Sequence, residues 1–151
     1  MFHKTLIMEK LKKIVFACFM FLMATPFTAM AAENGSESDS FDWTPVIEAI
    51  IQVESNGNAK AVKGNSAGAM QITPILVKEC NQILKRKKSK KRYKLSDRFN
   101  VSKSKEMFLL FQSYFNPAND IEKAIRSWNG GLHYSVRKTQ RYLEKVRQAM
   151  R

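Results

Sequence analysis

Glu54 is the residue whose type and position best suit acid–base chemistry. It ends an apolar run that starts at Val46, and a polar, glycine-containing stretch follows at residues 57–68. Apolar surroundings disfavour an ionised carboxyl and raise its pKa, so that the group can donate a proton near neutral pH. Most glutamates at helix ends are ordinary surface residues. Glu54 by itself therefore gives only a weak indication of a general acid.

Other catalytic chemistries find little support in the sequence. Beyond residue 31 the only histidine is His133, which follows two glycines and is interpreted as a surface or capping residue. No spacing of His, Cys and carboxylate residues resembles a zinc site, and no glycine-rich loop ends in Lys-Ser or Lys-Thr. Cys80 falls in a helical apolar pattern, which favours a small buried residue over a nucleophile. We therefore expect no metal and no cofactor.

The elements that must position Glu54 are predicted to be almost all helical. Apolar residues recur at helical spacing in segments that begin near residues 42–44, 73–74, 102, 121 and 136. Asp42 or Thr44 and then Thr73 are the expected caps, each followed by a proline, and Ser102 is expected to cap the third helix. The third helix has apolar side chains at Met107, Phe108, Leu110, Phe111, Tyr114 and Phe115, which indicates burial on most sides. Residues 57–68 predict a structured loop with at most a short hairpin.

The first 31 residues resemble a secretory signal peptide. Lys10, Lys12 and Lys13 precede an apolar run over residues 14–24, and Ala29-Met30-Ala31 supplies small residues for cleavage. The apolar run is too short to cross a bilayer, which takes about 20 residues. The predicted organisation is a signal peptide at 1–31, a flexible leader at 32–41 and one catalytic domain at 42–151. It predicts a periplasmic or secreted protein with no stable membrane insertion after cleavage.

The chain is strongly basic, with 26 Lys and Arg against 13 Asp and Glu. Residues 1–31 hold four of the basic residues and one acidic residue, so the remainder carries 22 − 12 = +10. A charge of this size favours anionic partners such as nucleic acid, acidic lipid or a cell-wall polymer with carboxylates. Export argues against nucleic acid. Cys80 is the single cysteine after residue 31, which leaves no partner for an intrachain disulfide.

Residues 85–94 (Lys-Arg-Lys-Lys-Ser-Lys-Lys-Arg-Tyr-Lys) concentrate this positive charge. One interpretation is a strip that binds anions. The other is a solvated and mobile surface segment, because like charges repel one another. The sequence leaves both interpretations open.

Four short motifs in order resemble those of the soluble-type lytic transglycosylases, a branch of the lysozyme superfamily. They span roughly residues 44–147 and consist of Glu54-Ser55, Gly68-Ala69-Met70-Gln71, Trp128-Asn129-Gly130-Gly131 and Tyr142-Leu143 with Val146. The resemblance implies an all-α, lysozyme-like domain with a substrate cleft. Two positions depart from the common family pattern: Ala69 stands where leucine is frequent, and Trp128 where tyrosine is frequent.

The resemblance also implies a role for each motif. Glu54 would be the sole catalytic acid and base, and Ser55 would orient its carboxyl or the substrate. Met70 and Gln71 would contact sugar along the cleft. Trp128 and Asn129 would lie beside the catalytic acid, and the hydroxyl of Tyr142 would reach towards it.

The implied reaction cleaves the β-1,4 bond between N-acetylmuramic acid and N-acetylglucosamine in peptidoglycan, and it forms a 1,6-anhydro sugar without water. The protein would act as a monomer, and its exo- or endo-action stays open. One alternative is a hydrolytic muramidase on the same fold, which needs a second carboxylate such as Asp97 or Glu79. The other is a non-enzymatic cationic wall-binding protein that uses residues 85–94.

Overall fold

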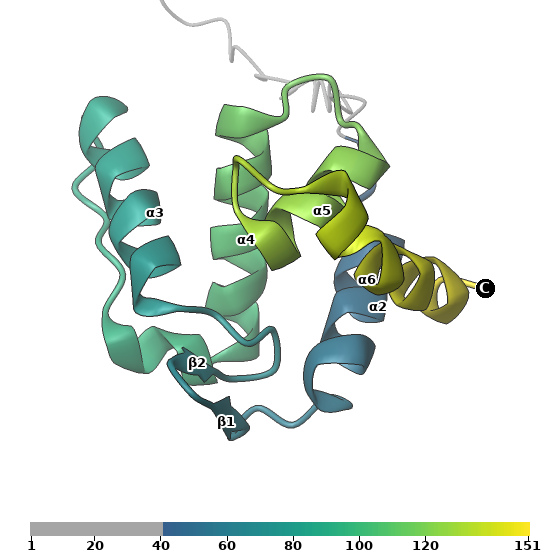
Figure 1. Cartoon of the computed structure of the whole chain (residues 1–151). Helices are drawn as coiled ribbons and strands as arrows, with labels where there is room; N and C mark the ends of the chain where they lie inside the picture. Colours follow the sequence, from purple (N-terminus) through teal and green to yellow (C-terminus); the bar gives the residue numbers. More distant parts are fainter. Residues whose placement is uncertain (1–40) are drawn as a thin grey trace, which may run out of the picture. The chain divides into compact units, whose positions relative to one another are not determined.

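The structure, a computed structural model, describes residues 41–151. The predicted signal peptide and almost all of the predicted leader lie outside the described residues. The helices of the described part are α2 (Thr44–Ser55), α3 (Pro74–Arg86), α4 (Val101–Phe115), α5 (Ile121–Gly130) and α6 (Val136–Ala149) (Figure 1). A 3₁₀ helix, η1 (Leu95–Phe99), precedes α4.

The predicted fold class is confirmed. The strands in this part of the chain are β1 (Val62–Lys63) and β2 (Ser66–Ala67), which pair antiparallel as a short hairpin between α2 and α3. Everything else regular is helical, as the 3.6-residue spacing of apolar positions predicts. Between residues 41 and 151, none of the helices combines the length and the apolar character needed to cross a membrane.

The helix starts agree with the prediction at α3 and differ at α2 and α4. The Thr73 hydroxyl accepts a hydrogen bond from the Leu76 amide at 3.2 Å, which is the predicted cap. Asn100, rather than Ser102, caps α4, because its side-chain oxygen accepts the Lys103 amide at 3.0 Å. At α2 the cap position belongs to Trp43, and the predicted Asp42 accepts the amide of Thr44, two residues further on, at 2.9 Å.

The core forms around the first half of α4. Met107 and Phe108 are fully buried, and the Phe108 ring packs between Trp43 and Trp128 with centroid distances of 5.5 and 5.2 Å. The prediction that α4 is buried on most sides is wrong, because Leu109 in its middle and Tyr114 near its end remain exposed. Because Phe108 contacts residues that lie before α2 and in α5, this core holds together the helices that carry the four motifs.

Cys80 is fully buried, as predicted. Its thiol lies 3.6 Å from the Met107 carbonyl oxygen, across the contact between α3 and α4. Burial raises the pKa of the Cys80 thiol to about 12, so the group stays protonated at neutral pH. A buried neutral thiol acts as a small apolar side chain rather than as a nucleophile.

Candidate active site

Glu54 lies in the last turn of α2, which packs against α6 (Figure 1). Its side chain is half-buried, and its Oε1 accepts a hydrogen bond from the Tyr142 hydroxyl at 2.7 Å. These residues come from the first and last helices of the described part, 88 positions apart. The structure therefore brings together the first motif and the closing tyrosine at hydrogen-bond distance.

Three influences set the pKa of the Glu54 carboxyl. Burial raises the pKa of Glu54, while the hydrogen bond from Tyr142 and the positive charge of Lys63 lower it. The effect of burial is the largest, so the pKa of Glu54 stands above its ordinary value. A raised pKa keeps more of the carboxyl protonated at neutral pH, which is the state that a general acid requires.

Arg126 fixes the start of the helix that carries Tyr142. It is a buried residue of α5, and its guanidinium donates to the Val136 carbonyl, the Thr139 hydroxyl and the Gln140 side chain at 2.7–3.0 Å. On the other side it donates to Glu122 at 2.8 Å. Its Nε thus binds Glu122, while its two terminal nitrogens bind the first turns of α6. This clamp sets the position of α6, and with it the position of the Tyr142 hydroxyl.

Ser55 connects α2 to the second motif. Its hydroxyl donates to the Ala69 carbonyl oxygen at 2.8 Å. The predicted role was orientation of the carboxyl or of the substrate, whereas the observed bond ties the end of α2 to the chain at residues 68–71. Ser55 thus positions Glu54 and the second motif relative to each other.

Gly68 is needed where η1 crosses the second motif. It has a φ of +81°, and a Cβ built there would lie 1.7 Å from the Arg98 carbonyl oxygen. The Arg98 side chain binds the same region, with donations to the Asn65 and Ile72 carbonyls at 3.0 and 3.2 Å. Only a residue without a side chain allows this approach of two backbones.

Met70 does not fulfil the predicted contact with sugar through its side chain. The side chain is fully buried in the core and has no exposed surface for a ligand. Its carbonyl oxygen instead accepts a hydrogen bond from the Trp128 indole at 3.3 Å. This bond joins the second motif to the third. It also gives the indole N–H, which replaces the tyrosine hydroxyl frequent in the family, a partner on the backbone.

Gln71 is held in a strained backbone conformation with an unpaired acceptor. Its φ is +50°, which is uncommon for a residue other than glycine. The side-chain amide donates to the Gly68 and Ala61 carbonyls at 2.9 and 3.3 Å, which fixes its orientation. Its Oε1 is buried and has no partner among the described residues. A buried acceptor without a partner costs free energy, so this oxygen is one of the few unsatisfied polar atoms in the described part of the chain.

A groove of about 350 Å³ runs between the start of α3 and the end of α5. This volume falls within the range of small-molecule sites. Apolar side chains make up most of its wall, and Gln71, Glu79 and Asn129 add polar groups. The apolar lining residues include Ile75, Leu76, Phe111, Trp128 and Leu132.

The groove gathers three of the predicted site residues, and neither Glu54 nor Tyr142 is part of its lining. Gln71, Trp128 and Asn129 line the groove. The residues that line it do not include Glu54, which is connected to its wall through Ser55, Ala69 and the Met70–Trp128 bond. In the described part of the chain neither Trp128 nor Asn129 forms a hydrogen bond with Glu54, and the placement of these two residues beside the acid stays a prediction.

Several residues that build the site were missed at the sequence level. Lys63 acts on the Glu54 charge from the hairpin, and Arg98 and Arg126 hold the hairpin and α6 in place. Ile75 and Leu132 form exposed parts of the groove wall. Ile75 fits the apolar spacing of its helix, which indicates burial, so the sequence did not reveal its exposure. The sequence also contained no sign of the roles of Arg98 and Arg126, because a long basic side chain is expected on the surface unless its partners are known.

The two carboxylates considered for a hydrolytic mechanism differ in their surroundings. Asp97 accepts from Lys103 at 2.7 Å and from the Lys94 amide at 2.9 Å, and the bond with Lys103 lowers the pKa of Asp97. It is thus an ionised structural group of η1. Glu79 lines the groove and is the carboxylate there. No group of three or more His, Cys, Asp or Glu side chains gathers at one place within residues 41–151.

Comparison with known protein families decides the assignment. The family described as Transglycosylase SLT domain matches residues 31–149. The chain belongs to this family. SLT domains are the catalytic domains of lytic transglycosylases of the lysozyme-like superfamily, so this chain is a peptidoglycan-acting glycan lyase. No curated protein and no solved structure matches it.

The family match covers all the helices that the structure describes. It starts at residue 31, before the predicted domain start at residue 42, and it ends with the last residue of α6. All four motifs of this SLT domain fall inside the match. Since the polymer that the family cleaves lies outside the cytoplasm, the SLT domain acts extracytoplasmically.

Proposed function

We propose that this SLT domain cleaves the bond between N-acetylmuramic acid and N-acetylglucosamine by transglycosylation, with Glu54 as acid and then as base. The supporting observation is the half-buried Glu54 carboxyl held by the Tyr142 hydroxyl at 2.7 Å. Burial supplies the raised pKa that the acid step needs. The Tyr142 hydroxyl stabilises the carboxylate that exists between the two proton transfers.

The proposed reaction returns every proton that it uses. Glu54 donates its proton to the glycosidic oxygen, and the bond from that oxygen to C1 of the muramic residue breaks. The N-acetyl oxygen of the muramic residue stabilises the cationic centre. The Glu54 carboxylate then takes the proton of the C6 hydroxyl, and O6 forms a bond with C1. The products are a 1,6-anhydro sugar and a free hydroxyl on the leaving sugar, and Glu54 is protonated again. A single carboxyl suffices, whereas ordinary glycosidases use two.

The groove is the proposed binding site for the glycan strand. Trp128 offers an aromatic face, and Gln71 and Asn129 offer hydrogen-bonding groups. The unpaired Gln71 Oε1 can accept from an N–H or O–H of a sugar once the side chain turns towards the groove that it lines. Exposed apolar side chains at Ile75 and Leu132 complete the wall against which sugar C–H groups can pack.

Analysis of the cleavage products tests this proposal. Purified sacculi are digested with the protein, and the released glycan ends are identified by mass spectrometry. We expect 1,6-anhydro ends in nearly all products. Reducing ends would instead identify a hydrolytic muramidase, and then Glu79 in the groove becomes the second carboxylate to test by a Glu79→Gln substitution. Absence of any released glycan, with the protein bound to the wall, would favour the non-enzymatic cationic alternative.

Replacement of Tyr142 by phenylalanine is expected to shift the pH profile as well as the rate. The loss of a hydrogen bond to a charged group should lower kcat about tenfold to hundredfold. The Tyr142 hydroxyl lowers the pKa of Glu54, so its removal raises that pKa further. The alkaline limb of the rate profile, where the acid form is lost, should therefore move to higher pH. Release of anhydro products across a pH series measures both effects.

Tyr134→Phe is the matched control for this substitution. Tyr134 is half-buried, and its hydroxyl makes no hydrogen bond to another part of residues 41–151. The control should leave the rate and the pH profile unchanged. An unchanged pH profile in Tyr142→Phe would mean that the hydroxyl does not act on the catalytic carboxyl.

Export and assembly belong to the same proposal. We infer that the signal peptide at 1–31 directs the protein to the periplasm or outside the cell, where the polymer lies. The catalytic domain, expected over residues 42–151, then works as a monomer on glycan strands, without a metal or cofactor and without nucleic acid as a partner.

A further inference from the structure

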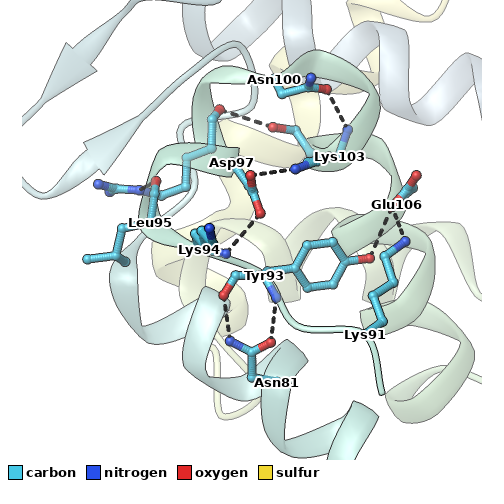
Figure 2. Close-up of polar contacts among 11 residues, drawn as sticks. Asn81, Lys91, Tyr93, Lys94, Leu95, Asp97, Asn100, Lys103 and Glu106 are labelled. Carbon is cyan, nitrogen blue, oxygen red and sulfur yellow. Dashed lines mark hydrogen bonds and ion pairs between the residues drawn. The ribbon is translucent and has the colours of Figure 1, made fainter. Parts of the chain in front are cut away.

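The basic segment (residues 85–94) is an ordered part of the fold, anchored at both ends. At its start the Lys87 and Ser89 amides donate to the Ile83 and Leu84 carbonyls at 2.9 Å, with Lys88 in the left-handed region. At its end Tyr93 is buried, and its backbone forms two hydrogen bonds with the Asn81 side chain, at 2.8 and 2.9 Å (Figure 2). The segment is thus held in place in spite of its concentrated charge.

One lysine of the segment serves this anchoring. Lys91 pairs with Glu106 of α4, and the Tyr93 hydroxyl donates to the same carboxylate at 3.3 Å (Figure 2). The bond with Lys91 lowers the pKa of Glu106, which keeps the acceptor ionised. The connection between α3 and α4 is therefore built around Asn81, Tyr93 and Glu106.

The other cations of the segment point outward without acidic partners. Lys85, Lys87, Lys88 and Lys90 are exposed and form no ion pair within residues 41–151. Arg92 donates to the Ser89 and Lys91 carbonyls at 2.7 and 2.6 Å, so its charge is also uncompensated. Like charges so close together repel. The anchored backbone nevertheless keeps these charges together on one segment, where they can face a polyanion.

The basic segment lies on the opposite face of α3 from the groove. Ile75, Leu76 and Glu79 of α3 line the groove, whereas Asn81 binds the basic segment. At 3.6 residues per turn, Asn81 is rotated by about 200° from Glu79. In Figure 1 the chain after α3 returns along the side of α3 that is farther from α5. A strand bound in the groove would therefore leave the basic segment free.

We propose that the basic segment is a second wall-binding surface, which holds carboxylates of peptide-substituted glycan next to the strand in the groove. The proposal rests on the proposed function for its polymer. Peptidoglycan carries repeated peptide carboxylates, and an ordered row of lysines complements such a polyanion. The surface retains the enzyme on insoluble wall and takes no part in the chemical step.

Binding of the intact protein to sacculi tests this surface. The sacculi are first freed of phosphate-containing polymers, and the Glu54→Gln background prevents digestion. The test variant carries Lys85→Gln, Lys87→Gln, Lys88→Gln and Lys90→Gln, none of whose side chains makes a hydrogen bond within the described part. We expect half-maximal binding to need roughly tenfold more sacculi, since four exposed ion pairs contribute fractions of a kcal/mol each. The loss should vanish at about 1 M salt.

A control variant removes the same charge elsewhere. It carries four glutamines in place of basic residues that are distant in sequence from the segment and form no ion pair within residues 41–151: Lys60, Lys123, Arg137 and Arg151. Its binding should change less than twofold. Equal weakening in both variants would overturn the proposal, because net charge and not this surface would then govern binding.

Chemical capping of the carboxylates identifies the ligand. On sacculi whose carboxylates have been amidated, the protein with the four lysines should bind no better than the test variant. An advantage that persists on amidated sacculi would also overturn the proposal. The four substitutions are also made in the protein that keeps Glu54, where they should leave kcat/KM on short soluble glycan unchanged.

The proposed function and the binding surface can fail independently. If the protein that keeps Glu54 releases no glycan, the proposed function fails, but the comparison of binding is unaffected because it does not depend on cleavage.

Discussion

Replacement of Glu54 by glutamine is expected to lower the rate of glycan release by at least about 10²–10⁴-fold, the usual contribution of general acid–base catalysis. Glutamine has the shape of glutamate and can still accept the hydrogen bond from Tyr142, but it cannot give and take back a proton. The binding groove stays intact. The measurement is the amount of anhydro product released from sacculi by equal amounts of the two proteins.

Glu48→Gln is the control for this loss. Glu48 lies on the same helix, is exposed and pairs with Lys105, so its removal leaves the Glu54 site untouched. It should retain the full rate, because a surface ion pair contributes little. Release of glycan by Glu54→Gln at a rate close to that of the unsubstituted protein would show that another group transfers the proton.

Thermal unfolding of the same variant provides a pH-dependent check on its environment. The pKa of Glu54 in the folded protein stands above its ordinary value of 4.5. Its contribution to stability is therefore fully present below pH 4.5 and is lost as the pH rises through the raised pKa. Glutamine carries no such dependence. The Tm of Glu54→Gln, relative to the unsubstituted protein, should thus rise between acidic and neutral pH.

Replacement of Gly68 by alanine is expected to lower the free energy of unfolding by about 3–5 kcal/mol, from left-handed strain together with overpacking. The added Cβ would lie 1.7 Å from the Arg98 carbonyl oxygen and 2.7 Å from its carbon. Both atoms belong to a backbone, so no side-chain rotation can relieve the clash. Separation of the hairpin from η1 would also shift Ala69 and Gln71. Denaturant unfolding measures the loss of stability.

Gly64→Ala separates the clash from the strain. Gly64 also has a positive φ, of +58°, but a Cβ there meets nothing within 4 Å. We expect it to cost about 1 kcal/mol, from the left-handed conformation alone. Equal losses of stability in the two variants would contradict the role of the close approach at Gly68.

The position of Tyr142 depends on the packing of three helices. Tyr142 is in contact with Glu54 because α6 packs on α2, and α6 is held by Arg126 of α5. Arg126 lies two residues before Trp128, so one segment supplies both a wall of the groove and the clamp on α6. A change at Arg126 would thus alter the surroundings of the Glu54 carboxyl through Tyr142.

The sequence by itself determined the helices, the cap at Thr73, the burial of Cys80 and the family motifs. These follow from apolar spacing and capping, which act over a few neighbouring residues. The position of Glu54 at the end of an apolar run gave only a weak indication of an acid, and the resemblance to the family supplied the predicted role. The start of α4 was placed late, since Asn100 and Ser102 are both good caps and only the η1 turn favours Asn100.

Only the tertiary structure decided which side chains meet. Glu54 and Tyr142 lie 88 residues apart in the chain, and they meet only because α2 and α6 pack together. The burial of Met70 and the hydrogen bond from the Trp128 indole to its carbonyl depend on packing in the same way. The same holds for the basic segment, whose order comes from the bonds between Asn81 in α3 and the backbone of Tyr93, which lies outside any helix. Such contacts join residues far apart in the chain, so no local pattern of residue types records them.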